Sequence, residues 1–331
     1  MQTVLPRWRG FNVDNMFHSG GYKPFAEEDF EWIADWGFDY VRISVSHIHV
    51  MKEGDPYQAN ERGLAEVDRG LELAHRHGLH ACLDMHTAPG YAYHESEEVG
   101  GYDLWKDGEA QRAFCHLWQV YARRYQGIAS SQLSFNLINE PAAEIGQMTG
   151  EEYAAVARQA IAVIREISPE RLIIGDGMEW ASVPCPELAP LGIAQSGHFY
   201  APHLLTHYRA EWAGPEVMTS PEPVWPGIVM EGRRWDRAVL AEHLRPWFEL
   251  ADQGVGVHFN EGGVHNKTPH TVALAWLRDT LELLKSHNIG YAVWNFRGSF
   301  GILDSGRADV EYEDFHGHKL DRKMLELLQG I

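Results

Sequence analysis

Residues 132–141 read QLSFNLINEP, a mostly apolar run that ends on an amide, a carboxylate and a proline. The run has the length and composition of a short β-strand. Because proline cannot continue the hydrogen-bonded ladder of a strand, the chain must leave the sheet at Pro141. The pattern predicts a strand over 132–140 with Asn139 and Glu140 at its carboxyl end, which is the end that carries the chemistry in parallel α/β folds. For these three residues alone, a solvated Asn-Glu-Pro turn is the alternative.

Short apolar runs alternate with helical patterns along the rest of the chain. The predicted strands cover 9–12, 38–46, 79–86, 132–140, 171–176, 193–200, 255–261 and 289–296. The predicted helices cover 25–36, 61–77, 108–125, 151–167, 236–251, 271–287 and 319–328. Eight strands that alternate with helices predict a (β/α)8 TIM barrel, formed by a single domain over residues 1–331. An open, doubly wound sheet is the alternative, but it usually has a glycine-rich phosphate loop after the first strand, and this sequence has none there.

Composition narrows the range of partners. The 331 residues include 28 Lys and Arg against 47 Asp and Glu, which gives a net charge of −19 at pH 7. Nucleic acids and anionic membranes bind clustered cations, so neither is expected as a partner, whereas a neutral polymer is indifferent to this charge. Three cysteines are too few and too scattered for a disulfide framework or a zinc site.

The amino terminus shows no apolar stretch of signal-peptide length, and no segment of the sequence reaches transmembrane length. The sequence as written therefore predicts a soluble, cytoplasmic chain. A secreted chain whose signal peptide has been removed would look the same.

Polar or aromatic residues stand at or near the carboxyl ends of most predicted strands. Each of them has an ordinary packing role as its alternative, but their arrival at one rim of a barrel predicts a functional site. The set comprises Asn12, Arg42, His86, Asn139, Glu140, His198, Tyr200, Glu261 and Trp294.

The two carboxylates of this set suggest the reaction. Glu140 follows the fourth strand and Glu261 the seventh, so the two side chains can face each other across the mouth of the barrel. A pair roughly 5 Å apart supports double displacement at an acetal carbon, with one carboxylate as nucleophile and the other as proton donor. Arg42 is a candidate to keep one carboxylate ionised. Asn139 could bind the sugar hydroxyl beside the reacting carbon, and Trp294 offers a flat face for a sugar ring.

With these motifs in this order, the chain resembles glycoside hydrolase family 5, the retaining β-glycosidases that include cellulases and mannanases. The resemblance covers nearly the whole chain and matches the family pattern at all eight strand-end positions from Arg42 to Trp294. It rests on RGFN at 9–12, Arg42 in VRISVS, His86 in DMHTAPG, NEP at 139–141, HFY at 198–200, Glu261 in HFNEGG and Trp294 in AVWNF. It implies a (β/α)8 barrel with Glu140 as acid/base and Glu261 as nucleophile. It also implies that a further set of residues lines the subsite where the bond breaks: Arg42, His86, Asn139, His198, Tyr200 and Trp294.

Other aromatic residues lie in predicted rim loops and could serve as sugar platforms, although about half of them should prove to be packing. They are Trp180, which we include among the substrate-binding residues, and Tyr91, Trp105, Trp212 and Trp225. His203 and His207 have the i,i+4 spacing of a metal-binding helix but lack its glutamate. We therefore expect neither a metal nor a cofactor. Arg297, Asp304 and His316, near the last strand, could add a subsite.

Two other classes of protein remain as alternatives. His47-Ile48-His49 has the His-x-His form of metal-dependent amidohydrolase barrels, but those enzymes place this pair on the first strand and here it follows the second. A non-catalytic carbohydrate-binding barrel would lack one of the two glutamates.

The expected partner is a β-linked glucan or a similar polysaccharide. An endo-acting β-1,4-glucanase is the first hypothesis, followed by an exo-acting β-1,3-glucanase or β-glucosidase and then by a β-mannanase. The loops over 89–107 and 201–235 should shape the cleft and decide among these activities.

Overall fold

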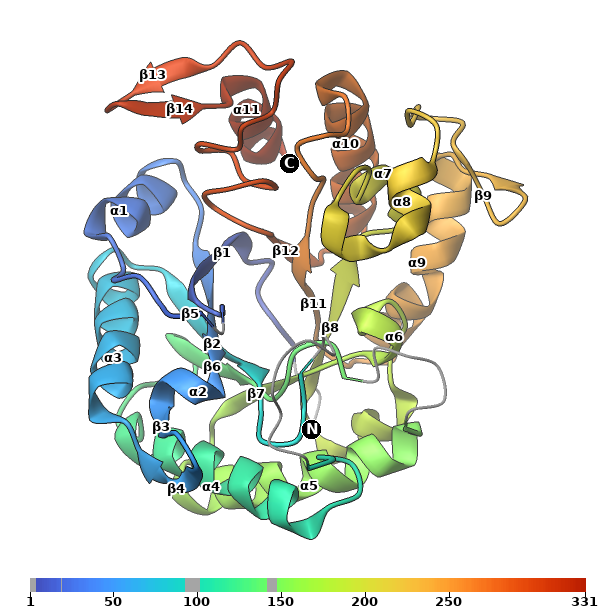
Figure 1. The fold of residues 1–331 in the computed structure, drawn as a ribbon. Coiled ribbons are helices and arrows are strands. Elements are labelled where there is room, and N and C mark those ends of the chain that lie inside the picture. The colour runs from blue at the N-terminus through green and yellow to red at the C-terminus, as the bar shows by residue number, and fades with distance from the viewer. Residues whose placement is uncertain (1–3, 19, 93–101, 142–147) are drawn as a thin grey trace.

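Eight parallel strands close into a barrel in the computed structural model, which describes residues 4–18, 20–92, 102–141 and 148–331 (Figure 1). Around the barrel the strands follow the order β1-β12-β11-β8-β7-β6-β5-β2, and β2 pairs with β1 to complete the ring. The eight strands are β1 (Arg9–Met16), β2 (Tyr40–Ser46), β5 (His80–Thr87), β6 (Leu133–Asn136), β7 (Leu172–Asp176), β8 (Ala194–Phe199), β11 (Val257–Gly262) and β12 (Gly290–Val293). The predicted (β/α)8 barrel is confirmed.

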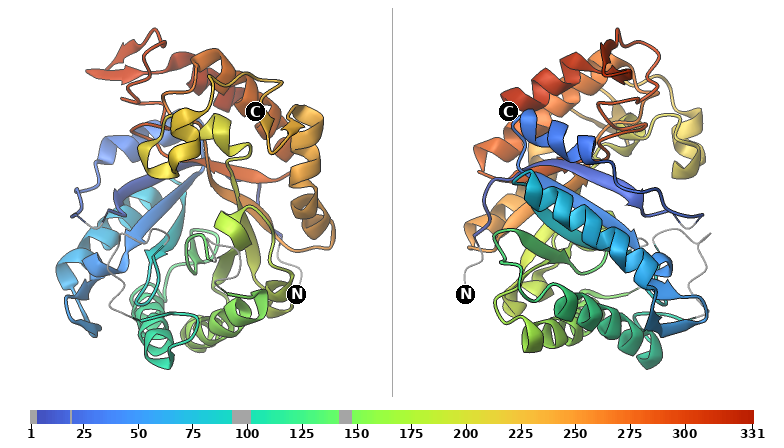
Figure 2. Two further views of the ribbon diagram at one scale, coloured as in Figure 1. Left: turned by 45° about the vertical axis from the view of Figure 1, so that its right-hand side comes forward. Right: turned by 90° about the vertical axis from the view of Figure 1, so that its left-hand side faces the viewer.

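Amphipathic helices cover the outer face of the strands (Figure 2). In α3 the buried Leu64, Val67 and Leu71 recur at steps of three and four, which places one apolar stripe against the sheet. Asp236 caps the amino terminus of α9, and its carboxylate accepts hydrogen bonds from two backbone amides. The long helices are α1 (Glu27–Asp35), α3 (Glu61–Arg76), α4 (Gly108–Arg124), α5 (Gly150–Ile167), α9 (Arg237–Asp252), α10 (His270–Ser286) and α11 (Arg322–Gly330).

Short elements extend the loops between the strands and helices. The short helical turns are α2 (His47–Val50), α6 (Met178–Ala181), η1 (Pro186–Leu191), α7 (His203–Thr206), η2 (Glu211–Ala213) and α8 (Pro215–Thr219). Three small hairpins pair β3 (Met51–Lys52) with β4 (Asp55–Ala59), β9 (Val229–Met230) with β10 (Arg233–Arg234), and β13 (Glu313–Phe315) with β14 (His318–Leu320). None of the helices in the described part of the chain is long and apolar enough to span a membrane.

The inside of the barrel changes from apolar to polar along the strands. A small apolar cluster occupies the amino-terminal end and includes Tyr40, Cys82 and Ile174. Side chains two residues apart on a strand point to the same face. The next side chains that point into the barrel, two residues further along the same three strands, are therefore those of Arg42, Asp84 and Asp176. The apolar cluster therefore supports a charged layer, and the site lies above that layer.

Two strands end four residues away from their predicted carboxyl ends, and β12 ends at Val293 rather than at Phe296. The fourth predicted strand, β6, ends at Asn136 rather than at Glu140. Beyond it, Leu137 still donates a backbone hydrogen bond to Ile174 on β7 (2.9 Å), whereas Asn139 donates to Met85 on β5 (3.1 Å). The chain thus changes neighbours before it reaches Glu140. The first strand continues to Met16 rather than ending at Asn12, because its pairing with β2 resumes at Met16 after an irregularity.

Candidate active site

Arg42 on β2 is the centre of a buried polar layer within the barrel. Its side chain is fully buried, and burial opposes its charge, but the neighbouring carboxylates raise its pKa above the ordinary value. Arg42 is therefore a permanent cation that holds its neighbours in place. The guanidinium contacts Asn12 Oδ1 (3.1 Å), Asn136 Oδ1 (3.0 Å), Asn139 Oδ1 (2.8 Å), Glu261 Oε2 (2.8 Å), Asp84 Oδ1 (3.1 Å) and Asp176 Oδ2 (3.6 Å).

Glu261 on β11 has a donor on each carboxylate oxygen. Arg42 Nη1 donates to Oε2 at 2.8 Å, and the Tyr200 hydroxyl donates to Oε1 at 2.8 Å. Burial and the nearby carboxylates raise the pKa of Tyr200 well above its ordinary value, so this hydroxyl keeps its proton and remains a donor. A cation and a hydrogen-bond donor both favour the ionised carboxylate. These two donors thus fix the orientation of the Glu261 carboxylate at the mouth of the barrel.

Glu140 follows β6 in a different setting. Its backbone has a φ of 46°, in the left-handed region, and its amide donates to Asp176 Oδ2 at 3.1 Å. The Tyr91 hydroxyl donates to the carbonyl of Glu140. The side chain has one close partner, since Oε1 lies 2.8 Å from Nδ1 of His198. The backbone contacts thus fix the position of Glu140 and leave its carboxyl group with less support for a negative charge than Glu261 has.

The charges around Glu140 and His198 are linked. Burial raises the pKa of Glu140, and the hydrogen bond and charge of His198 act in the opposite direction. Burial alone would lower the pKa of His198, but the charges of Glu261 and Asp176 outweigh it and raise this pKa to about 10. Asp176 lies 3.2 Å from Nε2 of His198, and its pKa is lowered because His198 and Arg42 more than offset its burial. His198 is therefore cationic at neutral pH and lies between three carboxylates.

Glu140, His198 and Glu261 converge on one point. One side-chain ligand atom of each lies within 4.8 Å of those of the other two, so carboxylate oxygens of Glu140 and Glu261 are no farther apart than this. No other group of three such side chains in the described ranges comes this close together. A metal would require a neutral imidazole, whereas His198 is held in its protonated form. The arrangement therefore suits proton transfer and nucleophilic attack better than metal binding.

Burial changes our interpretation of two predicted substrate-binding residues. Asn12 and Arg42 have no exposed surface. The side-chain oxygen of Asn12 accepts a hydrogen bond from Arg42, and its side-chain nitrogen donates one to the backbone carbonyl of Asn260 (2.8 Å). We therefore interpret both as residues that position Glu261 and Asn139 rather than as contacts of the sugar.

The remaining predicted subsite residues lie around the carboxylates. Asn139 accepts from Arg42 through its oxygen, which leaves its amide nitrogen as a donor for a ligand. His86 Nδ1 lies 2.8 Å from Asp84, and its ring stacks on Trp294 at 5.5 Å. Trp294 in turn precedes a cis peptide to Asn295.

The candidate sugar platforms divide into two groups. Trp180 in α6 and Trp212 in η2 expose 48% and 53% of their surface, so both can meet a ligand. Tyr91, Trp105 and Trp225 are buried packing residues. Part of the predicted loop over 89–107 lies outside the described residues.

The histidine pairs considered as metal ligands have separate partners. His47 Nδ1 lies 2.8 Å from Thr87 Oγ1, whereas His49 Nε2 lies 2.6 Å from the carbonyl of His18. His203 and His207 stack on each other at 4.3 Å, and burial lowers the pKa of both. Neither pair joins a third ligand within the residues described.

The predicted extra subsite near the last strand is a network within the protein. Arg297 donates to Asp29 on α1 at 2.9 Å and to Asp304 at 3.2 Å, and the ring of His316 stacks on Trp32 at 5.5 Å. These contacts tie the segment after β12 to α1.

Sequence reasoning did not identify four residues of the polar layer, namely Asp84, Asn136, Asp176 and Asn260. Asn136 donates to Asp176 at 2.9 Å, and Asn260 donates to Asn136 at 3.2 Å. A signal was present, because Asp84 and Asn136 precede His86 and Ile138 by two positions and Asp176 ends an apolar run. A polar residue at one of the last positions of an otherwise apolar, buried strand is therefore the sequence signal that could have predicted this layer.

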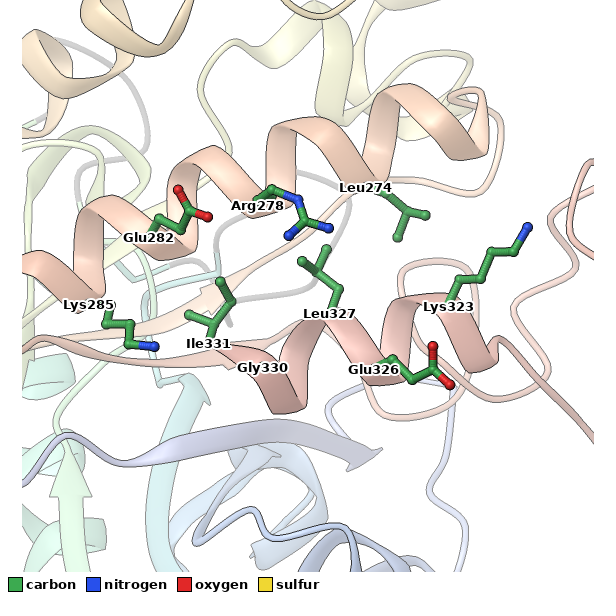
Figure 3. A pocket seen from close by; sticks show the side chains of 9 residues that line it. All are labelled: Leu274, Arg278, Glu282, Lys285, Lys323, Glu326, Leu327, Gly330 and Ile331. Atoms are coloured by element: carbon green, nitrogen blue, oxygen red, sulfur yellow. The ribbon is translucent and has the colours of Figure 1, made fainter.

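A hollow on the described surface lies away from these residues. It has a volume of about 480 Å³ and is formed between α10 and α11, with Leu274, Arg278, Leu327 and Ile331 among its lining residues (Figure 3). None of the predicted catalytic or substrate-binding residues lines it.

Comparison with known proteins agrees with this geometry. Residues 3–299 match the family model Cellulase (glycosyl hydrolase family 5). Endoglucanase C of Acetivibrio thermocellus is 26% identical over 312 residues, which cover 87% of this chain and 89% of the relative. Cellodextrinase A of Ruminococcus flavefaciens is 26% identical over 276 residues, or 80% of this chain and 76% of the relative.

Solved structures agree as well. A crystal structure of a glycoside hydrolase superposes with a TM-score of 0.93 at 36% identity and covers 98% of this chain and 99% of the other. An endoglucanase of Thermotoga maritima shares the fold, with a TM-score of 0.77 at 23% identity over 97% of this chain and 96% of the other. The predicted relationship is confirmed, and the chain belongs to glycosyl hydrolase family 5.

Proposed function

We propose that the protein is a retaining β-glycosidase that cleaves β-1,4-linked glucan, with Glu261 as nucleophile and Glu140 as acid/base. The observation that carries the proposal is the approach of the two carboxylates to within 4.8 Å in unequal surroundings. Retaining enzymes hold their carboxyl groups about 5–5.5 Å apart, whereas inverting enzymes leave about 6.5–9.5 Å for a water molecule. The short separation supports double displacement.

In the first step, a Glu261 oxygen attacks the anomeric carbon while Glu140 gives its proton to the departing oxygen. Arg42 and Tyr200 hold the two oxygens of Glu261 in place, and burial raises the pKa of Glu140, which favours its protonated form. In the second step, Glu140 takes a proton from water, and the hydroxide displaces Glu261 from the sugar. Two inversions restore the β configuration.

The strand order supports a proposal for the two ends of the cleft. Glu140 follows β6, and β6 pairs with β7, whose loop carries Trp180, so the departing sugar should lie on that side. Trp212 lies farther round, after β8. The glycone sugar should lie on the opposite side, where Trp294 follows β12 next to β1. Two exposed indoles at the rim, Trp180 after β7 and Trp212 packed against His265 and Phe300, suit an extended polymer, and relatives named endoglucanase and cellodextrinase support β-1,4-glucan as the substrate.

A hydrolysis panel tests the proposal. Wild type and Glu261→Ala would be incubated with carboxymethyl-cellulose, β-1,3-glucan, mixed-linkage glucan, mannan and short β-linked oligosaccharides. We expect the wild type to cut carboxymethyl-cellulose and cello-oligosaccharides and the variant to cut nothing. If the wild type cleaved only β-1,3-glucan or only mannan, that polymer would be the substrate instead of β-1,4-glucan. Inactivity of the wild type on every substrate would overturn the proposed function.

The stereochemistry of the first product tests the mechanism separately. Proton NMR of the earliest product should show the β anomer, followed by slow mutarotation. An initial α anomer would mean single displacement and would exclude Glu261 as a nucleophile.

A further inference from the structure

Asp14, at the carboxyl end of β1, is a carboxylate that the roles assigned so far do not use. β1 is a barrel strand flanked by β12 and β2, so its carboxyl end opens on the glycone side of the cleft. Asp14 is partly exposed, whereas Asn12, two positions earlier on the same strand, is fully buried beneath the site. Asp14 therefore stands higher in the cleft than Asn12, at a level that a ligand can reach.

The contacts of Asp14 place it beside the Trp294 platform. Its Oδ2 accepts a hydrogen bond of 2.6 Å from Nδ2 of Asn295, the residue that follows Trp294. Phe17 follows directly after β1, and its ring packs edge-on against Trp294 (5.1 Å) and His86 (5.3 Å). Asp14 thus shares one wall with Trp294 and His86, two residues that line the predicted subsite.

The charge of Asp14 is only partly compensated. Asn295 donates a side-chain hydrogen bond to it, no lysine or arginine in the described ranges forms an ion pair with it, and the nearby charges of His18 and His86 act to lower its pKa. Burial raises the pKa of Asp14, and the hydrogen bond from Asn295 acts in the opposite direction. A carboxylate has about four acceptor sites, so Asp14 retains capacity for further donors. Leaving that capacity unused in a half-buried place is costly unless a ligand or water supplies the donors.

We propose that Asp14 is a sugar-binding residue that accepts hydrogen bonds from hydroxyl groups of the glycone bound against Trp294. The inference rests on the proposed function and deepens it, because it names a group that would discriminate among glycone sugars. Hydroxyl groups are the donors that a sugar presents around the edge of its ring, while its faces stack on indole. Asn295 holds Oδ2 and fixes the orientation of the carboxylate, so Oδ1 is the atom left for the sugar.

A coupling experiment between the side chain and the substrate tests the proposal. The substrates would be 4-nitrophenyl β-cellobioside and analogues that lack one hydroxyl at a time on the two glucose units. On the parent substrate, Asp14→Asn should lower kcat/KM by about 10- to 100-fold, the range expected for a hydrogen bond to a charged group. On the analogue that lacks the partner hydroxyl, the variant and the wild type should differ by less than about threefold.

A purely structural role gives a different pattern. If Asp14 only latches β1 to the segment after β12, the variant should lose thermal stability and lose the same factor of kcat/KM on every analogue; that result would overturn the proposal. Glu326→Gln is a charge-matched control, because Glu326 is exposed on α11 beside the hollow in Figure 3, and this variant should match wild type throughout.

The failure of the proposed function would be visible separately. If the wild type cleaves none of these glycosides, the glycosidase assignment fails first, and the Kd for cellobiose by calorimetry then decides the role of Asp14. A Kd weakened about 10-fold or more in Asp14→Asn would support the contact, and an unchanged Kd would overturn it.

Discussion

The polar layer beneath the carboxylates and the rim loops above them are built in opposite ways. The polar layer, formed by Arg42, Asp84, Asn136, Asp176 and Asn260, has no exposed surface, and its members bond to one another from different strands. The rim loops, which follow β7 and β8, present Trp180 and Trp212 about half exposed. The side chains of the polar layer are buried and held by several hydrogen bonds, whereas the rim loops are open to solvent.

Backbone conformation sharpens the contrast. Glu179, Trp180 and Ala181 all have φ values of 55°, which costs non-glycine residues about 1–2 kcal/mol each. Two backbone hydrogen bonds between Met178 and Val183 (2.8 and 3.2 Å) close this turn at its base. The polar layer holds charge in place, while the rim holds a strained backbone in order to display an indole. We infer that reaction chemistry depends on the first region and chain-length preference on the second, and the following predictions test that division.

The largest effect is expected at the junction of the two regions. Glu261→Ala removes the proposed nucleophile, so turnover should fall by roughly 10⁴- to 10⁶-fold, as in other enzymes that lose a covalent catalyst. Arg42 keeps Asp84 and Asp176 as partners, so the protein should remain folded by circular dichroism. Azide should restore activity and give the α-glycosyl azide. A variant that still turns over natural substrate without azide would remove Glu261 from the reaction.

A large effect on stability is expected within the polar layer. Arg42→Met removes the guanidinium from Asp84 and leaves Asp176 and Glu261 with His198 alone as a cation, so the free energy of unfolding should fall by about 3–5 kcal/mol in urea titrations. Arg42→Lys retains the charge but cannot reproduce contacts in several directions, and we expect partial recovery of stability with little activity. Unchanged stability in the Met variant would mean that the layer is not the rigid element described above.

A smaller effect is expected in the pH dependence of activity. His198→Asn removes a hydrogen bond and a positive charge that lower the pKa of Glu140. That pKa should therefore rise, and the alkaline limb of kcat/KM, where Glu140 loses its proton, should move to higher pH. If the limb moved to lower pH or did not move in a folded variant, the alkaline limb would not report the deprotonation of Glu140.

The same substitution also gives a test on stability. The pKa of His198 is raised from 6.5 to about 10 in the folded protein, so its contribution is complete below pH 6.5 and is lost as the pH rises through 10. The free energy of unfolding of the wild type should fall across this range, and the fall should be smaller in His198→Asn. Parallel pH profiles for the two proteins would contradict the raised pKa.

The sequence predicts some of this organisation and misses the rest for a physical reason. Apolar runs that end on polar residues located all eight strands, and the motifs around Glu140 and Glu261 located both carboxylates. The depth of a side chain in the barrel, however, depends on the register between neighbouring strands, which no single segment encodes. Asn12 and Arg42 are paired across β1 and β2 in this way, and both are fully buried in the barrel.

The polar layer and the strand ends illustrate the same limit. Asp176 looked like an ordinary strand end, yet it joins Glu140, His198 and Arg42 through contacts that span distant parts of the chain. The extended stretch before Glu140 looked like one strand, but its hydrogen bonds pass from β7 to β5. The sequence pattern of a strand indicates that a polar residue points into the barrel. Only the folded barrel shows which residues it contacts.

The smallest effect is expected at the rim, where the two indoles should act on long substrates alone. Burial of roughly 50 Å² of apolar surface at about 25 cal/mol per Å² gives about 1 kcal/mol, so Trp180→Ala and Trp212→Ala should each lower kcat/KM on cellohexaose by about fivefold. On 4-nitrophenyl β-cellobioside both variants should match wild type, because its leaving group does not extend to a second sugar. Trp→Phe at either position should lie in between, since phenylalanine retains part of the flat surface. Equal losses on the short and the long substrate would mean that these loops support the catalytic carboxylates, and the division between polar layer and rim would then be wrong.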